Sequence, residues 1–183
     1  MAADLANQLA QGPGAASTEE LLAQPSPSQK GLTLSDQFND LTGRIREVLR
    51  VARILRIDAP CGGYVHFDGS KAALVEVEGG NQELGKEIGM QVVATRPDVV
   101  AIKDLDPALV AKEREILGAA ARKEGKPENI IEKMIDGRLR NFYAERVLNE
   151  QPFIKDDSKT VGKLGEENDM KIVRFQYWEL GGN

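Results

Sequence analysis

The stretch that most resembles a catalytic motif is GNQELGK, residues 80–86, which matches the beginning of a phosphate-binding loop. In such a loop the residue after the lysine is Ser or Thr, whose hydroxyl reaches Mg²⁺. Here that residue is Glu87, and its carboxylate would repel phosphate. We therefore expect no nucleotide site. Gly85 and Gly89 lie four residues apart, where each would cost a helix about 1 kcal/mol relative to alanine, so we interpret them as positions of close packing against a sheet.

The histidine and the cysteine are each the only one of their kind in the chain. His66 therefore cannot belong to a metal site with several histidine ligands, and no Ser or Cys nucleophile is spaced beside it. Cys61, which precedes two glycines, could be a reactive thiol, but a small buried or half-exposed residue where a strand begins is the more common case. We expect no enzymatic activity and no cofactor.

Charge argues against nucleic acid as a direct partner. The formal net charge is −5, whereas a general nucleic-acid binder carries a basic excess. A run of arginines could still suggest RNA, but it spans a helix end and a strand, so we expect the side chains to diverge and to pair with Glu76 or Glu78 across the sheet. The run consists of Arg44, Arg46, Arg50, Arg53 and Arg56.

The chain carries no sign of a membrane protein. No apolar run approaches the ~20 residues that span a bilayer, and the N-terminus lacks the pattern of a signal peptide. With one cysteine the chain cannot form an intrachain disulfide, which is typical of a cytosolic protein. We therefore expect a cytoplasmic protein without membrane contact.

The elements that must position these residues can be read from the periodicity of apolar residues. Helices are expected over residues 2–10 and 18–23, and from Thr33 an amphipathic helix of about four turns that includes Val48 and Leu49. Strands are expected over residues 51–57, 64–67 and 71–78, the last two joined by an Asp-Gly turn. Asn81 should cap a helix that ends at Arg96-Pro97.

Two long helices follow, beginning at Asp106-Pro107 and separated by residues 125–127. So short a connection forces them to run antiparallel, as in a coiled-coil hairpin. We expect Met134, Phe142 and Tyr143 in the seam between the helices rather than on a binding surface, and Gly137 to permit their close approach. Apolar stripes should line that seam: Leu109, Ile116 and Ala120 as well as Val110, Leu117 and Ala121 on the first helix, and Ile131, Ile135, Leu139 and Phe142 on the second.

The stretch QPFIKDDSKTVG, residues 151–162, should be the return path from the hairpin. We expect Gln151-Pro152 to end the second long helix and Phe153 and Ile154 to enter the core, ahead of a short helix over 161–167 and a last strand in KIVRFQYWEL. The fold class predicted is α+β, with an antiparallel sheet of about three strands packed with helices and an inserted antiparallel helical hairpin. The expected division is 1–32 (remnant of a preceding subdomain and linker), 33–104 (first part of the core), 105–150 (hairpin) and 151–183 (second part of the core).

Three stretches resemble, in order and spacing, the C-terminal half of elongation factor Ts: ELGKEIGMQVVATRPDVV, GKPENIIEKMIDGRLRNFYAERVLNEQPFIKDDSKTVGKL and VRFQYWELG. The resemblance runs from about Thr33 to Gly181. It implies binding to the GTPase elongation factor Tu and, in the full-length family member, promotion of GDP release. Two parts of the family pattern are absent from these residues: a small N-terminal three-helix domain and a Thr-Asp-Phe-Val motif. We therefore expect a fragment that binds elongation factor Tu but is poor at nucleotide exchange.

The resemblance also implies a partner-binding site. The Tyr-x-His step before the Asp-Gly turn matches a family position that contacts the third domain of elongation factor Tu. The partner-binding residues expected by resemblance are Tyr64, His66, Phe67, Asp68 and Gly69. The alternative function is that of a structural module that self-associates or acts as a scaffold through the sheet and the hairpin, and a homodimer is compatible with either reading.

Overall fold

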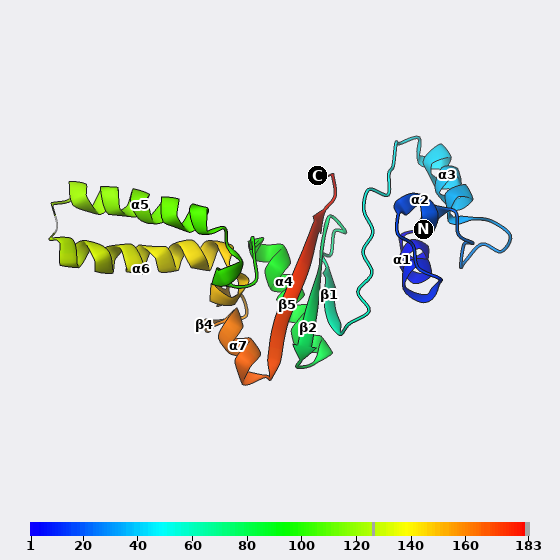
Figure 1. The fold of residues 1–183 in the computed structure, drawn as a ribbon. Helices are drawn as coiled ribbons and strands as arrows, with labels where there is room; N and C mark the ends of the chain where they lie inside the picture. The colour runs from blue at the N-terminus through cyan, green and yellow to red at the C-terminus, as the bar shows by residue number, and fades with distance from the viewer. Residues whose placement is uncertain (126, 182–183) are drawn as a thin grey trace. The chain divides into compact units, whose positions relative to one another are not determined.

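The computed structural model describes residues 1–125 and 127–181. The chain divides into two compact units, Met1–Asp58 and Ala59–Asn183, and Figure 1 traces both from the N-terminus to the C-terminal strand. The predicted α+β class is confirmed, whereas the divisions predicted at residues 32, 104 and 150 stay predictions.

The first unit contains three short helices, α1 (Ala2–Gln11), α2 (Thr18–Leu22) and α3 (Leu34–Ile45). α3 begins with a capping box in which the Thr33 and Asp36 side chains each accept the other's backbone N–H. Of the apolar side chains in this unit only Leu21 and Leu34 are buried, so it has little core, and polar bonds help to hold it together. Gln37, also buried, accepts from Ser26 at 2.9 Å and donates to Asp4 at 2.7 Å.

Two predictions for this unit are wrong. α3 ends at Ile45, where Arg46 takes a left-handed conformation with φ of 58°, so Val48 and Leu49 lie beyond the helix. Residues 51–57, predicted as a strand, belong to neither sheet. Strand propensity reflects packing against a paired neighbour, and neither sheet of the described residues includes this segment.

The second unit is built on an antiparallel sheet with the order β1 (Cys61–Val65), β2 (Lys71–Gly79), β5 (Met170–Glu179). The central strand β2 pairs with β5 from Lys71 opposite Glu179 to Gly79 opposite Met170, with a bulge after Glu76. Strands on either side of the helical hairpin in sequence therefore belong to one sheet, as predicted.

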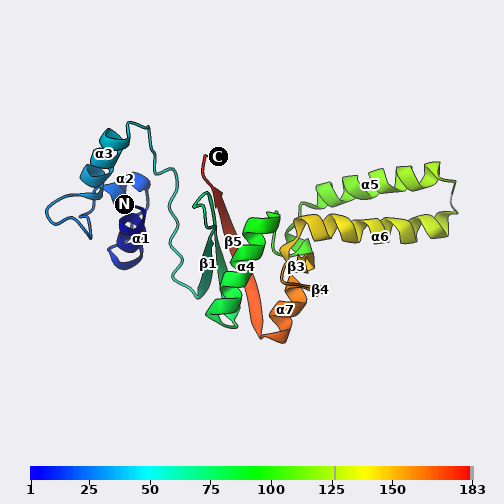
Figure 2. The same ribbon diagram turned by 180° about the vertical axis from the view of Figure 1, so that it is seen from behind.

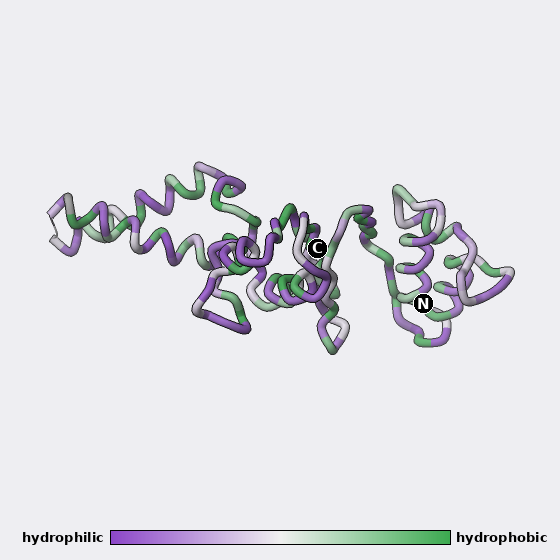
Figure 3. Tube along the Cα trace, turned by 90° about the horizontal axis from the view of Figure 1, so that it is seen from below, coloured by the Kyte–Doolittle hydropathy of each residue, from purple (hydrophilic) through white to green (hydrophobic). Residues whose placement is uncertain are grey.

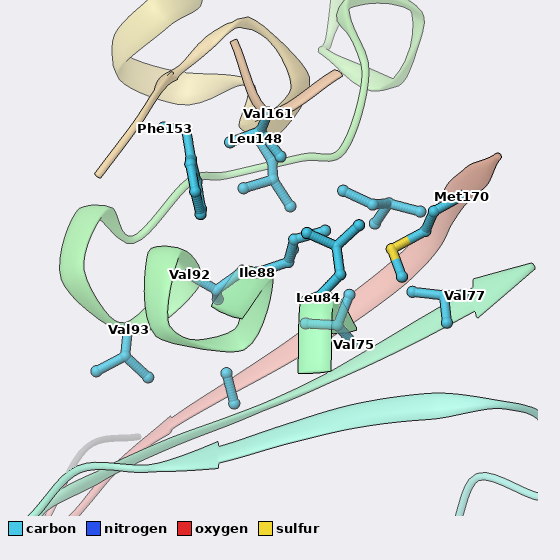
Figure 4. Close-up of a cluster of buried hydrophobic side chains, with 12 residues drawn as sticks. Val75, Val77, Leu84, Ile88, Val92, Val93, Leu148, Phe153, Val161 and Met170 are labelled. Atoms are coloured by element: carbon cyan, nitrogen blue, oxygen red, sulfur yellow. The ribbon is translucent and has the colours of Figure 1, made fainter. Parts of the chain in front are cut away.

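Helix α4 (Gln82–Thr95) covers one face of this sheet, as Figures 1 and 2 show from opposite sides. Figure 4 shows the resulting core, in which Leu84, Ile88 and Val92 of the helix meet Val75 and Val77 of β2. The predicted close packing of Gly85 is confirmed, because a Cβ on Gly62 of β1 would lie 2.1 Å from the Gly85 carbonyl carbon. Only glycine fits at this crossing.

The hairpin consists of α5 (Pro107–Lys123) and α6 (Glu128–Arg146), reached through the 3₁₀ turn η1 (Ile102–Asp104). Along both helices apolar and polar residues alternate, as the colours of Figure 3 show. The apolar ones form a second core, separate from that of the sheet: Leu117, Ala121, Ile131, Met134, Ile135, Leu139, Phe142 and Tyr143. Both stripes of the first helix were predicted to line the seam. Leu117 and Ala121 do so, but the prediction is wrong for Ile116, which is 52% exposed.

The glycine that faces the seam of the hairpin is Gly118 and not Gly137. A Cβ on Gly118 would lie 3.4 Å from Ile135, across the seam, whereas a Cβ on Gly137 would meet nothing within 4 Å. Ion pairs bridge the exposed sides of the two helices. Arg114 reaches Glu132 at 2.6 Å and Asp136 at 3.2 Å.

The return path differs in detail from the prediction. α6 ends at Arg146, before Gln151-Pro152, because Val147 and Leu148 are drawn into the core, where the Leu148 N–H donates to Val99 O at 2.9 Å. Phe153 is buried as predicted, but Ile154 is 42% exposed. The turn η2 (Leu148–Glu150), a small two-stranded sheet of β3 (Pro152–Phe153) and β4 (Asp156–Thr160), and α7 (Val161–Glu167) complete the path to β5.

A buried amide network fixes this return path to α4. Gln91 and Gln151 are both buried, and Gln91 Nε2 donates to Gln151 Oε1 at 3.1 Å. The Thr95 hydroxyl donates to the same Gln151 oxygen at 2.6 Å, and the Ile154 N–H donates to Gln91 Oε1 at 2.8 Å. Buried polar groups are tolerated only when they are hydrogen-bonded, so the network gives the base of the hairpin a defined position on the sheet unit.

Candidate partner-binding site

The loop between β1 and β2 presents the residues predicted to bind a partner. The His66 N–H donates to Lys71 O at 2.8 Å, and the Gly69 N–H donates to His66 O at 2.9 Å, which closes the turn. Gly69 has φ of 72°, a conformation that favours glycine. The Asp68 carboxylate accepts from the backbone N–H and the hydroxyl of Ser70, and these bonds lower its pKa below the ordinary value.

Three aromatic rings are brought together at this loop. The Tyr64 hydroxyl lies 3.1 Å from His66 Nδ1, and the His66 and Phe67 ring centroids are 4.6 Å apart. Tyr64 is half-buried and packs on Gly89 of α4, whereas Phe67 is 91% exposed. A large apolar ring held in solvent by a tight turn is a feature typical of binding surfaces.

A pocket of about 340 Å³ lies beside the aromatic rings, on the face of the sheet that α4 covers. Its lining residues on the side of the β1–β2 loop are Tyr64, His66 and Lys71. Those at the end of α4 are Met90, Val93, Ala94 and Arg96. The predicted set includes only the first two of these residues. Arg96 entered the sequence analysis only as the end of a helix, and nothing local indicated that it lines a pocket.

Arg96 is held in place by the last strand of the sheet. Its guanidinium lies 3.0 Å from Glu179 Oε1 and 5.5 Å from the centre of the Tyr177 ring. The Tyr177 hydroxyl donates to Glu179 Oε2 at 3.1 Å, and burial together with this bond raises the pKa of Tyr177. A cation is thus fixed at the rim of the pocket by residues more than 80 positions away in sequence.

The opposite face of the sheet carries a second set of apolar residues near the loop, of which Val65 is exposed and Ala72 and Trp178 are half-buried. Val65, Ala72 and Trp178 lie directly opposite one another on three neighbouring strands, so their side chains share this outer face. Val65 is 66% exposed, and Leu180, whose N–H donates to Ser70 O at 2.7 Å, is 83% exposed. The sequence analysis missed these residues, although the alternation in the last strand was a signal for them.

Residues 80–86 hold no phosphate loop. The Asn81 side chain accepts the Leu84 N–H at 2.9 Å and caps α4, while the space next to Gly80 is filled by the Met170 side chain. Glu87 pairs with Lys155 at 2.7 Å. These residues start and pack a helix.

Two further expectations are wrong. Glu76 and Glu78 pair with Arg174 and Lys171 of the neighbouring strand β5, because the arginine run lies outside the sheet. Within that run Arg44 pairs with Asp40 at 2.9 Å and Arg56 with Asp58 at 2.7 Å. Cys61, expected to be buried or half-exposed, is exposed, because its side chain points to the outer face of the sheet, away from α4.

Across residues 1–125 and 127–181, no three or more His, Cys, Asp or Glu side chains gather as a metal site would require. Over the same residues, each helix is too short or too polar to cross a membrane.

Comparison with known proteins points to one family. The family model described as elongation factor TS matches residues 1–182. Curated proteins named elongation factor Ts are similar to the chain. That of Thioalkalivibrio sulfidiphilus is 37% identical over 179 residues, which are 96% of this chain and 61% of the relative. That of Methylococcus capsulatus is 39% identical over 171 residues (91% of this chain, 57% of the relative), and that of Deinococcus radiodurans is 36% identical over 171 residues (92% and 65%). The chain therefore spans about three-fifths of the length of these relatives. The family model matches from residue 1, whereas the resemblance to the family was expected to begin at about Thr33.

Proposed function

The chain belongs to the elongation factor Ts family, and we propose that it acts in translation by binding the GTPase elongation factor Tu through the β1–β2 loop. The observation that carries this proposal is Phe67, which is 91% exposed and whose ring lies tilted beside that of His66, with 4.6 Å between the ring centroids, on a hydrogen-bonded turn. Exposed aromatic residues on a rigid turn give large contact area at small entropic cost, and such residues dominate binding energies.

The pocket beside the loop supports the same proposal. It is partly apolar through Met90, Val93 and Ala94, and it has Lys71 and Arg96 at its edge. Such a surface suits a partner that inserts an apolar side chain and places a carboxylate next to it. Binding of the chain at this surface would stabilise one conformation of the GTPase relative to another, so no catalytic residue of this chain is required.

The test is the double substitution His66→Ala/Phe67→Ala. We expect affinity for elongation factor Tu, measured by calorimetry, to fall about 30-fold, because truncating a central aromatic residue costs about 2 kcal/mol. The melting temperature should change by less than about 3 °C, because Phe67 is exposed, His66 is only half-buried, and neither belongs to a hydrophobic core.

Ile116→Ala is the matched control, since it removes another exposed apolar side chain, on α5. Its affinity should equal that of the unmodified chain. A large loss of stability with unchanged affinity in the double variant would assign the loop a structural role.

A further inference from the structure

The arginine run is not explained by the fold or by the candidate site. Its side chains were expected to pair with Glu76 and Glu78, but these carboxylates pair with residues of β5. Only the first arginine of the run, Arg44, lies within α3. The other four follow that helix and are all exposed: Arg46, Arg50, Arg53 and Arg56. The reason for setting RNA aside as a partner of this run therefore no longer holds.

The segment that carries these arginines has a backbone that is open to a partner. Residues 47–58 form no helix or sheet, and Figure 1 draws them as a plain trace. Leaving Arg53 aside, none of these residues makes a backbone–backbone hydrogen bond to another described residue. In complexes with nucleic acids, arginine side chains and backbone N–H groups supply many of the contacts to phosphate. This segment offers both kinds of donor.

Sequence and burial both repeat every three residues along this segment. Each of three exposed arginines is followed by a half-buried β-branched residue: Arg50-Val51, Arg53-Ile54 and Arg56-Ile57. Within residues 50–58, Leu55 is the one other half-buried position. A chain with three residues per turn and a rise of about 3.1 Å places residues three apart on one edge, about 9 Å from one another. The repeat thus favours a regular row of guanidinium groups on one edge of the segment, with the β-branched side chains on another.

The charge of this region is positive and comes from arginine alone. Residues 44–58 contain five arginines and no lysine, against Glu47 and Asp58, which gives a local net charge of +3 in a chain of net charge −5. Asp58 already pairs with Arg56, at 2.7 Å. A guanidinium group binds phosphate through two parallel hydrogen bonds and is more weakly hydrated than an ammonium group. A run of arginines without lysine therefore favours a partner that presents phosphates.

We propose that residues 46–56 bind the phosphates of an RNA strand. A regular row of guanidinium groups matches a polymer that carries one negative charge in every repeat, whereas the carboxylates of a folded acidic protein have no such regular spacing. RNA is the nucleic acid expected because the elongation factor family acts in translation. No aromatic residue lies within 44–58 to stack on bases, so the contact does not depend on base sequence. It uses no residue of the β1–β2 loop and is independent of binding to elongation factor Tu.

Fluorescence anisotropy of a labelled 20-nucleotide oligo-uridine RNA, titrated with the full chain, tests this proposal. When a protein contacts Z phosphates of a single strand, log affinity falls against log salt concentration with a slope of about −0.7Z. Four arginines predict a slope of about −2.8, so we expect the affinity to fall about 50-fold between 50 and 200 mM salt. Absence of binding at 50 mM salt, or an affinity that does not depend on salt, would overturn the proposal.

The double variant Arg46→Gln/Arg50→Gln locates the contact. We expect its affinity for the RNA at 50 mM salt to be at least about 10-fold lower and its slope to be about −1.4, because two of four phosphate contacts are removed. Lys133→Gln/Arg140→Gln is the matched control, since it removes the same charge from exposed residues of α6, and its slope should stay near −2.8. Equal effects of the two double variants would mean that this segment is not the binding site. Should circular dichroism show that the first variant is unfolded, Arg50→Gln alone, with an expected slope of about −2.1, gives the same test.

Two further probes distinguish RNA phosphates from other acidic partners. A labelled 20-residue polyglutamate peptide should bind at least about 10-fold more weakly than the RNA, because its carboxylates do not have the geometry of a phosphate backbone. Equal binding would assign the segment to an acidic protein and overturn the proposal. A single-stranded DNA of the same length should bind within about 3-fold of the RNA, because its phosphates are the same. A larger difference would contradict contact through phosphates alone.

Discussion

At the scale of single residues, the glycines show how much contact geometry a sequence leaves hidden. The spacing of Gly85 and Gly89 predicted that α4 packs closely on a sheet, and the structure confirms it. The spacing could not show that the partner of Gly85 is Gly62, nor that Gly137 lies in open space while Gly118 faces Ile135. A glycine's neighbours depend on the crossing of two elements, and local periodicity does not specify that crossing.

These glycines give a matched pair of variants. We expect Gly62→Ala to lower the free energy of unfolding by about 1–3 kcal/mol, because the new methyl group would overlap the α4 backbone and force the helix from the sheet. Gly137→Ala should raise it by about 0.5–1 kcal/mol, since alanine is the better helix former and meets nothing there. Urea denaturation followed by circular dichroism measures both. Equal effects would contradict the crossing of β1 and α4 described above.

At the scale of elements, the sequence predicted best where the structure is locally determined. Caps at Asn81 and Asp106, the antiparallel hairpin and the last strand all follow from local patterns, and each lies where it was expected. Predictions failed where the local structure depends on contacts with segments that are distant in sequence. Residues 51–57 have strand propensity but belong to neither sheet, and α6 ends early because Val147 and Leu148 are fully buried, Leu148 in the core of the sheet.

The hairpin gives a prediction at this scale. Its apolar seam is separate from the core of the sheet, so a Gly-Ser linker in place of residues 107–145 should leave a sheet unit that folds cooperatively. Extending the replacement to residue 149 should abolish folding, because it also removes Val147 and Leu148, both fully buried. Thermal unfolding followed by circular dichroism distinguishes the two variants. If the shorter replacement also failed to fold, the hairpin would be part of the folding core.

At the scale of the whole molecule, the sequence predicted the class of fold and the family, but only part of the candidate site. The loop residues were identified through their resemblance to the family, whereas Arg96 and Trp178 depend on the pairing of β2 with β5, which brings together residues about a hundred positions apart. Binding of the chain to elongation factor Tu and acceleration of nucleotide release are two separate predictions.

We expect these 183 residues to bind elongation factor Tu and yet to accelerate GDP release poorly. Acceleration requires contacts that are stronger in the nucleotide-releasing conformation than in the ground state. By family resemblance, such contacts come from the Asp-Phe pair of a Thr-Asp-Phe-Val motif, and no such motif occurs in this sequence. Under the proposed function, contacts through the β1–β2 loop would add affinity, but affinity that is equal for two states does not shift the equilibrium between them.

Stopped-flow release of a fluorescent GDP analogue from elongation factor Tu, at saturating chain, measures this directly. The rate should stay within about 10-fold of spontaneous release, because equal affinity for both conformations lowers no barrier. Calorimetry under the same conditions serves as the control, since it must show that the complex has formed. A rate comparable to that of a full-length family member would contradict this prediction, because it would mean that contacts made by these 183 residues distinguish the two conformations by themselves.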